Sequence, residues 1–81
     1  MTFPAFRYAT PMDYVSADAI DRWLYHRGFD TWSRRRDVKR AAADGGFSFK
    51  YGDTTYSIVE TIVDGVTQYA VWFDQITRST R

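Results

Sequence analysis

The most concentrated group of side chains that could bind a ligand is a basic run. Five cations and one acid, Asp37, fall within seven residues. The cations are Arg34, Arg35, Arg36, Lys39 and Arg40. At the period of a helix, Arg36, Lys39 and Arg40 share one side and are predicted to face solvent, flanked by Arg35. This surface is suited to nucleic-acid phosphates or to an acidic patch on a partner protein, where arginine is a frequent hot spot. A solvated outer face is the third interpretation.

Residue types that support catalysis or metal binding are sparse. The chain has no Cys, one His (His26) and one Glu (Glu60). A catalytic triad needs converging partners, and the carboxylates show no calcium-loop spacing. Glu60 is predicted opposite Tyr69 at the margin of the core. There we expect it to form an ion pair with an arginine and not to act as a general acid or base. We therefore expect no enzymatic activity, no catalytic residue, no metal site and no cofactor.

Two tight turns organise the second half of the chain. Gly52-Asp53 and Asp64-Gly65 each separate runs of alternating aromatic and β-branched residues, which indicates β-hairpins. With two-residue turns, Ile58 faces Val71, and a slip of one residue would turn every side chain to the other face. The resulting three-stranded antiparallel sheet gathers these side chains on one face: Phe47, Phe49, Tyr51, Tyr56, Ile58, Ile62, Tyr69, Val71 and Phe73.

The opposite face of that sheet is semi-apolar. Its candidate interface residues are Val59, Val63, Val66, Ala70 and Trp72. If the helices cover the first face, this one is open to a partner or to a second copy of the chain. The third strand, from Val66 to Phe73, carries no charge, so its edge needs cover from the Phe3–Tyr8 segment or from another chain.

Two helices are predicted ahead of the sheet. The first spans residues 16–27, because Ser16 is a good cap and Gly28 supplies a left-handed stop. The second ends at about Asp44 and has three candidate caps, namely Asp30, Thr31 and Ser33. The predicted order is α-α-β-β-β, with both helices on the aromatic face of a β-meander in an α+β fold.

Residues 1–15 have two interpretations. Phe6 and Tyr8 have the spacing of a short strand. The segment Thr10-Pro11-Met12-Asp13 has the features of a helix start, with a capping Thr, a Pro at the first helical position and an acid after it. An extra strand and a helical turn are therefore both retained.

Length and charge limit the function classes. The chain of 81 residues is predicted to be one domain, 1–81, with a helical part over 16–44, a meander over 47–73 and a frayed tail over 75–81. A net charge of +1 argues against a DNA mimic and lends little support to bulk nucleic-acid affinity. No run is apolar enough for a signal peptide or a membrane span. The lack of Cys favours the cytoplasm.

These observations favour a small non-enzymatic binding protein that acts by protein–protein contact. An inhibitor or adaptor fits this description, for example a phage or mobile-element protein that blocks a host nucleic-acid-handling complex. The alternative is a DNA- or RNA-binding domain that uses the basic second helix. A homodimer formed through the edge strand or the open sheet face is a further expectation.

Overall fold

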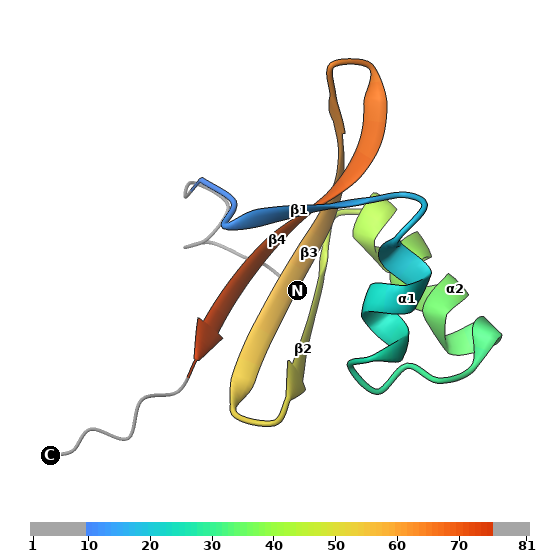
Figure 1. Cartoon of the computed structure of the whole chain (residues 1–81), viewed down its shortest axis with the longest axis vertical. Helices are drawn as coiled ribbons and strands as arrows, with labels where there is room; N and C mark the ends of the chain where they lie inside the picture. The colour runs from blue at the N-terminus through green and yellow to red at the C-terminus, as the bar shows by residue number, and fades with distance from the viewer. Residues whose placement is uncertain (1–9, 76–81) are drawn as a thin grey trace, which may run out of the picture.

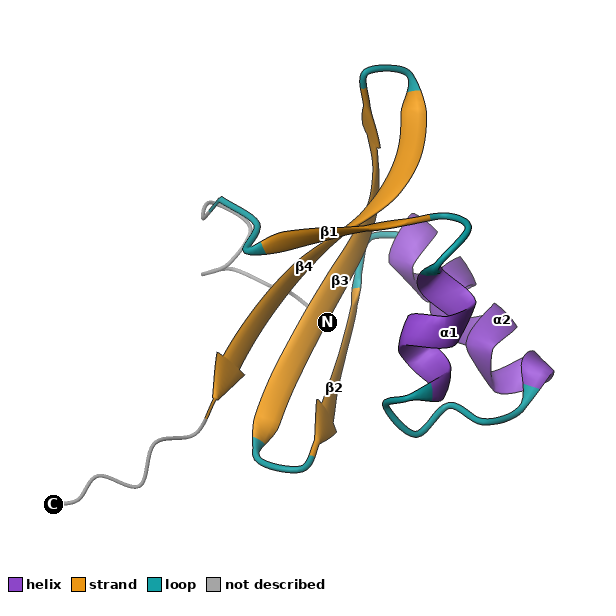
Figure 2. Ribbon diagram, viewed as in Figure 1, coloured by secondary structure: helices purple, strands orange, loops and turns teal. Residues whose placement is uncertain are grey.

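Four antiparallel strands and two helices make up residues 10–75, the part of the chain that the computed structural model describes. In chain order they are β1 (Asp13–Ser16), α1 (Ile20–Tyr25), α2 (Trp32–Ala43), β2 (Phe47–Tyr51), β3 (Thr54–Val63) and β4 (Val66–Gln75). The strands lie in the order β1-β4-β3-β2 (Figure 1). Both helices lie on the same side of this sheet (Figure 2). The α+β class is confirmed, whereas the prediction of three strands was wrong because β1 adds a fourth.

The two hairpins have the predicted register. Ile58 pairs with Val71 across β3 and β4, and Phe49 pairs with Tyr56 across β2 and β3. Asp64 and Gly65 have φ values of 53° and 79°, so both central residues of this turn are left-handed. A two-residue turn of that kind follows the right-handed twist of the flanking strands, which is why Asp-Gly marks hairpins so well.

The helix start predicted at Thr10-Pro11 is wrong, because this part of the chain leads into a strand. β1 pairs antiparallel with β4, from Asp13 opposite Val71 to Ser16 opposite Gln68. Pairing along the uncharged edge of β4 satisfies backbone groups that would otherwise be open, and this outweighs a local capping signal. β1 thus covers the edge of β4 from Gln68 to Val71. The predicted Phe3–Tyr8 strand lies outside the described residues, and so do residues 76–81 of the predicted frayed tail. The prediction was wrong for Gln75, which pairs with Thr54 at the end of β4.

The first helix is shorter than predicted and begins at Ile20. Ser16 belongs to the sheet, and its carbonyl oxygen and its Oγ both accept from the Ala19 amide, at 3.0 and 3.2 Å. Ser16 therefore closes the turn between strand and helix. The predicted stop is confirmed: Gly28 has a φ of 98°, and the Phe29 amide donates to the carbonyl of Leu24 at 3.1 Å.

The second helix agrees with the prediction. Thr31 is its N-cap, and the Thr31 Oγ1 accepts from the Arg34 amide at 3.3 Å. Val38 and Ala42 are buried on the inner side of the helix. Because its buried residues are small, the helix adds little apolar area of its own.

The core lies between the helices and the predicted apolar face of the sheet. Its buried members are Val15, Ile20, Leu24, Val38, Ala42, Ile58, Tyr69 and Val71. Aromatic rings border this cluster edge to face, with Phe49 centred 5.0 Å from Phe29 and 6.0 Å from Trp23. The covered face is therefore the one predicted.

The far end of the β3–β4 hairpin extends past both neighbouring strands. β2 pairs with β3 only as far as Ile58, and β1 pairs with β4 only between Gln68 and Val71. Residues 62–67 therefore form a two-stranded ribbon closed by the Asp64-Gly65 turn. It is the end of the hairpin at the top of Figure 1. Ile62, predicted on the core face, lies on this ribbon and is 70% exposed.

Candidate functional site

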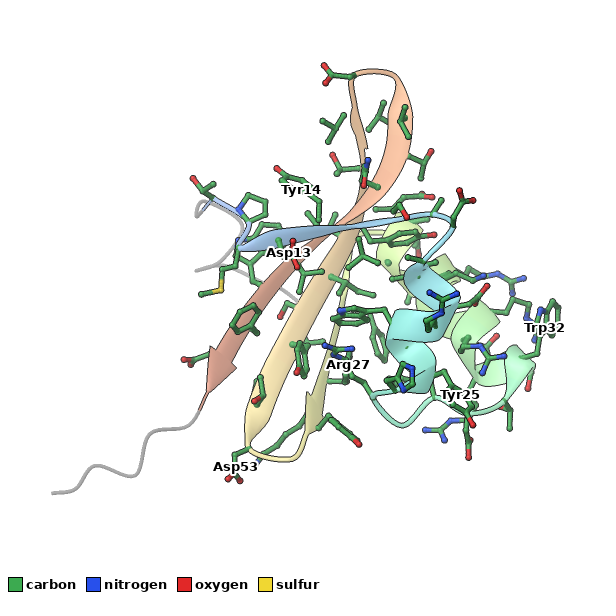
Figure 3. The ribbon with its side chains drawn as sticks, in the orientation of Figure 1. Asp13, Tyr14, Tyr25, Arg27, Trp32 and Asp53 are labelled. Atoms are coloured by element: carbon green, nitrogen blue, oxygen red, sulfur yellow. The ribbon has the colours of Figure 1, made fainter. Side chains whose placement is uncertain are left out.

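Exposed aromatic rings and arginines meet on the outside of the helices. Trp32 is 63% exposed and Tyr25 is 54% exposed, and both belong to the helical layer (Figure 3). The Arg36 guanidinium lies 5.1 Å from the Trp32 ring, and that of Arg35 lies 5.8 Å from the Tyr25 ring. Arg40 is exposed one turn after Arg36. We call the four exposed residues, Tyr25, Trp32, Arg36 and Arg40, the arginine–aromatic surface.

Asp21 on α1 joins the two helices through two cations of the basic run. Lys39 Nζ lies 3.0 Å from Asp21 Oδ1, and Arg35 Nε lies 3.6 Å from the same oxygen. Arg35 also donates through Nη1 to the carbonyl of Phe29 at 3.0 Å. The side chains of Lys39 and Arg35 are only 28% and 18% exposed. The prediction that Lys39 faces solvent was therefore wrong, because this lysine turns toward Asp21.

Arg34 stabilises the connection between the helices. The helical pattern groups Arg34 with the core residues Val38 and Ala42, yet the Arg34 side chain is 57% exposed. Its Nη1 donates to the carbonyl of Gly28 at 3.2 Å and lies 3.8 Å from Asp30 Oδ1. A long arginine stem allows this, since its charged end can reach the surface from a position at the margin of the core.

Only part of the basic run is available to an external anion. Arg36 pairs with its exposed neighbour Asp37 at 3.2 Å, a contact worth little in water. The Arg40 side chain has no ion pair or hydrogen bond with any residue in 10–75. Of the five predicted contact residues, the structure brings Arg34, Arg36 and Arg40 to the surface, whereas Arg35 and Lys39 are largely shielded and join α2 to α1 through Asp21.

The predicted sheet-face interface is partly exposed. Val66 is 53% exposed, whereas Ala70 is 3% exposed and has almost no surface to offer a partner. The other three predicted residues are half-buried, namely Val59, Val63 and Trp72. β1 adds Tyr14 opposite Ala70, with 47% of its surface exposed. Sequence reasoning missed Tyr14 because it did not predict β1.

Glu60 lies opposite Tyr69, as predicted, but forms no ion pair within residues 10–75. Burial raises the pKa of the Tyr69 phenol above 10.0, and the negative charges of Glu60 and then Asp21 raise it further. The neutral phenol is therefore the form that the folded protein holds. The arginine partner expected for Glu60 is absent from this part of the chain.

Tyr69 gives a prediction for alkaline pH. Its folded pKa lies above the unfolded value, so its contribution to stability is complete below pH 10 and is lost as the pH rises through the folded pKa. We expect the free energy of unfolding of the wild type to fall, relative to that of Tyr69→Phe, above pH 10. Urea denaturation across the alkaline range measures this difference, and a difference that stays constant with pH would contradict the assignment.

Neither a metal site nor a membrane span is present in the described part of the chain. No three His, Cys, Asp or Glu side chains between residues 10 and 75 are grouped to hold a metal ion. Neither described helix has the length and apolar character needed to cross a bilayer. No protein-family model, curated protein or solved structure matches this chain. The function proposed below therefore rests on the geometry of the protein itself.

Proposed function

We propose that the protein is a non-enzymatic binding protein that acts by protein–protein contact through its arginine–aromatic surface, as an inhibitor or adaptor does. The observation that carries the proposal is the exposed Trp32 ring with the Arg36 guanidinium stacked beside it. Trp, Tyr and Arg are the residue types most enriched at interface hot spots. A surface that presents all three residue types on the two helices offers apolar area and charge together.

The chemistry of this surface suits one kind of partner. Trp32 and Tyr25 would each bury much of a ring, which is a large apolar contribution for a single residue. Arg36 and Arg40 would pair with carboxylates beside those rings, and bidentate pairing gives the contact direction as well as strength. The expected partner therefore presents an apolar hollow bordered by acidic side chains.

Nucleic acid is the alternative occupant of the same surface. Arg34, Arg36 and Arg40 are exposed enough to neutralise phosphates, but Arg35 and Lys39 are engaged with Asp21. Three phosphate contacts give a log–log salt slope of only about −3. Affinity of that size is weak, which favours the protein partner.

The experiment is a pull-down from lysate at two salt concentrations, with and without nuclease, followed by affinity measurement on the retained protein. We expect Trp32→Ala to reduce the binding free energy by about 2 kcal/mol or more, as at a hot spot. Ile62→Ala is the matched control, because Ile62 is 70% exposed on the β3–β4 ribbon, away from the helices. It should leave binding unchanged.

Other outcomes would redirect or reject the proposal. Retention that disappears with nuclease or falls steeply with salt indicates nucleic acid. Binding lost with Ile62→Ala and kept with Trp32→Ala places the interface on the ribbon instead.

A further inference from the structure

The outer edge of β2 is open within residues 10–75. β2 is the last strand of the sheet and pairs on its inner side with β3 (Figure 1). No hydrogen bond joins the outer backbone groups of Phe47–Tyr51 to another element in the described part of the chain. An open edge presents unpaired N–H and C=O groups, to which an extended chain can add as a further strand.

The geometry of the hairpin identifies the backbone groups of β2 that point outward. In a hairpin with a two-residue loop, the residues that flank the loop exchange both hydrogen bonds, and the exchange recurs at every second pair. Here the flanking residues are Tyr51 and Thr54. Ser48 and Lys50 lie between the exchanging pairs, so their N–H and C=O groups point away from β3. A partner strand would bond to these two residues.

The charge along this edge is positive. β2 contains one cation, Lys50, and no acid. Lys50 is exposed and forms no ion pair within residues 10–75. Arg34 lies near the same end of the strand, because its Nη1 donates to the carbonyl of Gly28, and a Cβ on Gly28 would lie 3.6 Å from the Tyr51 ring. Its side chain is 57% exposed and lies 3.8 Å from the exposed Asp30.

These charges favour one kind of strand at the edge. A lysine on an edge strand discourages pairing with an apolar strand, and a second copy of the chain would bring two positive edges together. A strand with a carboxylate opposite Lys50 gains a cross-strand ion pair instead. The residues on either side of that carboxylate turn to the helix side, where Phe49 is half-buried and Tyr51 is 48% exposed. Apolar side chains suit those two positions.

We propose that the open edge of β2 binds an extended acidic segment of a partner protein, which adds antiparallel to the sheet with a carboxylate opposite Lys50 and apolar residues beside it. Main-chain hydrogen bonds to Ser48 and Lys50 supply the affinity, and the carboxylate supplies the preference. This site shares no residue with the arginine–aromatic surface and does not depend on the function proposed for it.

The test uses two peptides at millimolar concentration, acetyl-Val-Glu-Val-Thr-Val-amide and the same sequence with Lys in place of Glu. Binding is followed through the backbone amide signals of Ser48 and Lys50 in nitrogen–proton correlation spectra of the full chain. We expect the Glu peptide to move both signals to saturation and the Lys peptide to bind about fivefold more weakly or less. The indole N–H signal of Trp32 should stay unmoved, which separates this site from the arginine–aromatic surface.

Methylated peptides distinguish strand addition from simple charge attraction. In the antiparallel register, the Glu residue of the peptide donates its backbone N–H to Lys50, whereas the N–H of the Val that follows it points away from β2. N-methylation of the Glu should therefore weaken binding by about tenfold or more, because it removes a main-chain hydrogen bond. N-methylation of that Val should have little effect.

Substitutions at exposed positions test the charge. Lys50→Glu should reverse the preference, so that the Lys peptide binds more tightly than the Glu peptide. If the spectrum of this variant shows loss of fold, Lys50→Gln takes its place and should abolish the preference. Arg40→Glu is the matched control, because Arg40 is an exposed cation on α2, and it should keep the preference of the wild type.

Four results would overturn the proposal. They are no shift of the Ser48 and Lys50 signals with the Glu peptide, equal binding of the two N-methylated peptides, an unchanged preference in a folded Lys50 variant, and a shift of the same signals with protein concentration alone. The last result would assign the edge to a second copy of the chain.

Discussion

Ile58→Ala is expected to lower the free energy of unfolding by about 2–5 kcal/mol, the range for large-to-small changes in a core. Ile58 is fully buried and pairs with both Phe47 and Val71, at the centre of the sheet under the helices. A chain of 81 residues has a total stability of about 4–12 kcal/mol. The change therefore removes a large share of the stability, and urea denaturation followed by circular dichroism measures it.

The same protein contains a close control for this change. Ile62 has the same side chain, on the same strand and the same face, but is 70% exposed. Ile62→Ala should change the stability by less than about 0.5 kcal/mol, as for most surface substitutions. Similar effects of the two substitutions would mean that the helices do not cover Ile58.

Asp21→Asn is expected to destabilise the packing of α1 on α2 by about 1–3 kcal/mol, below the value for a fully buried pair because the Asp21 side chain is 49% exposed. The substitution leaves Lys39 and Arg35, both largely shielded from water, without their shared carboxylate. Denaturation at low and high salt measures the loss, which should be smaller at high salt because screening weakens the pair in the wild type.

Asp37→Asn is the matched control for this ion pair. Among residues 10–75, Asp37 forms an ion pair with Arg36 alone, and both side chains are well exposed. Loss of this ion pair should change the free energy of unfolding by no more than about 0.5 kcal/mol. Equal effects at the two positions would show that Asp21 is an ordinary surface acid.

The hairpins were predictable because their determinants are local. The pairs Asp64-Gly65 and Gly52-Asp53 restrict the turn, and alternation of side chains then sets the register over a few residues on either side. β1 lacked such a signal. It is four residues long and pairs with residues more than fifty positions away, and the capping pattern at Thr10-Pro11 favoured a different local structure.

The candidate site was only partly predictable for a related reason. A helical wheel places side chains around one axis and does not include the neighbouring helix. Lys39 therefore appeared to face solvent, although Asp21 lies close enough to bind it. Trp32 was not predicted as a site residue, because a single aromatic residue at the start of a helix belongs to no recognisable sequence motif. Only its exposure in the fold distinguishes it.

The unequal lengths of the strands have a consequence for local unfolding. β3 and β4 are paired over ten residues, but within residues 10–75 the pairs nearest Asp64 have no third strand beside them. The helices lie away from this end of the hairpin in Figure 1. Two-stranded ribbons in water are marginal on their own. The free energy of opening should therefore fall along β3 from Ile58 toward Asp64, so that the ribbon frays reversibly while the covered half of the same strand opens only when the whole domain unfolds.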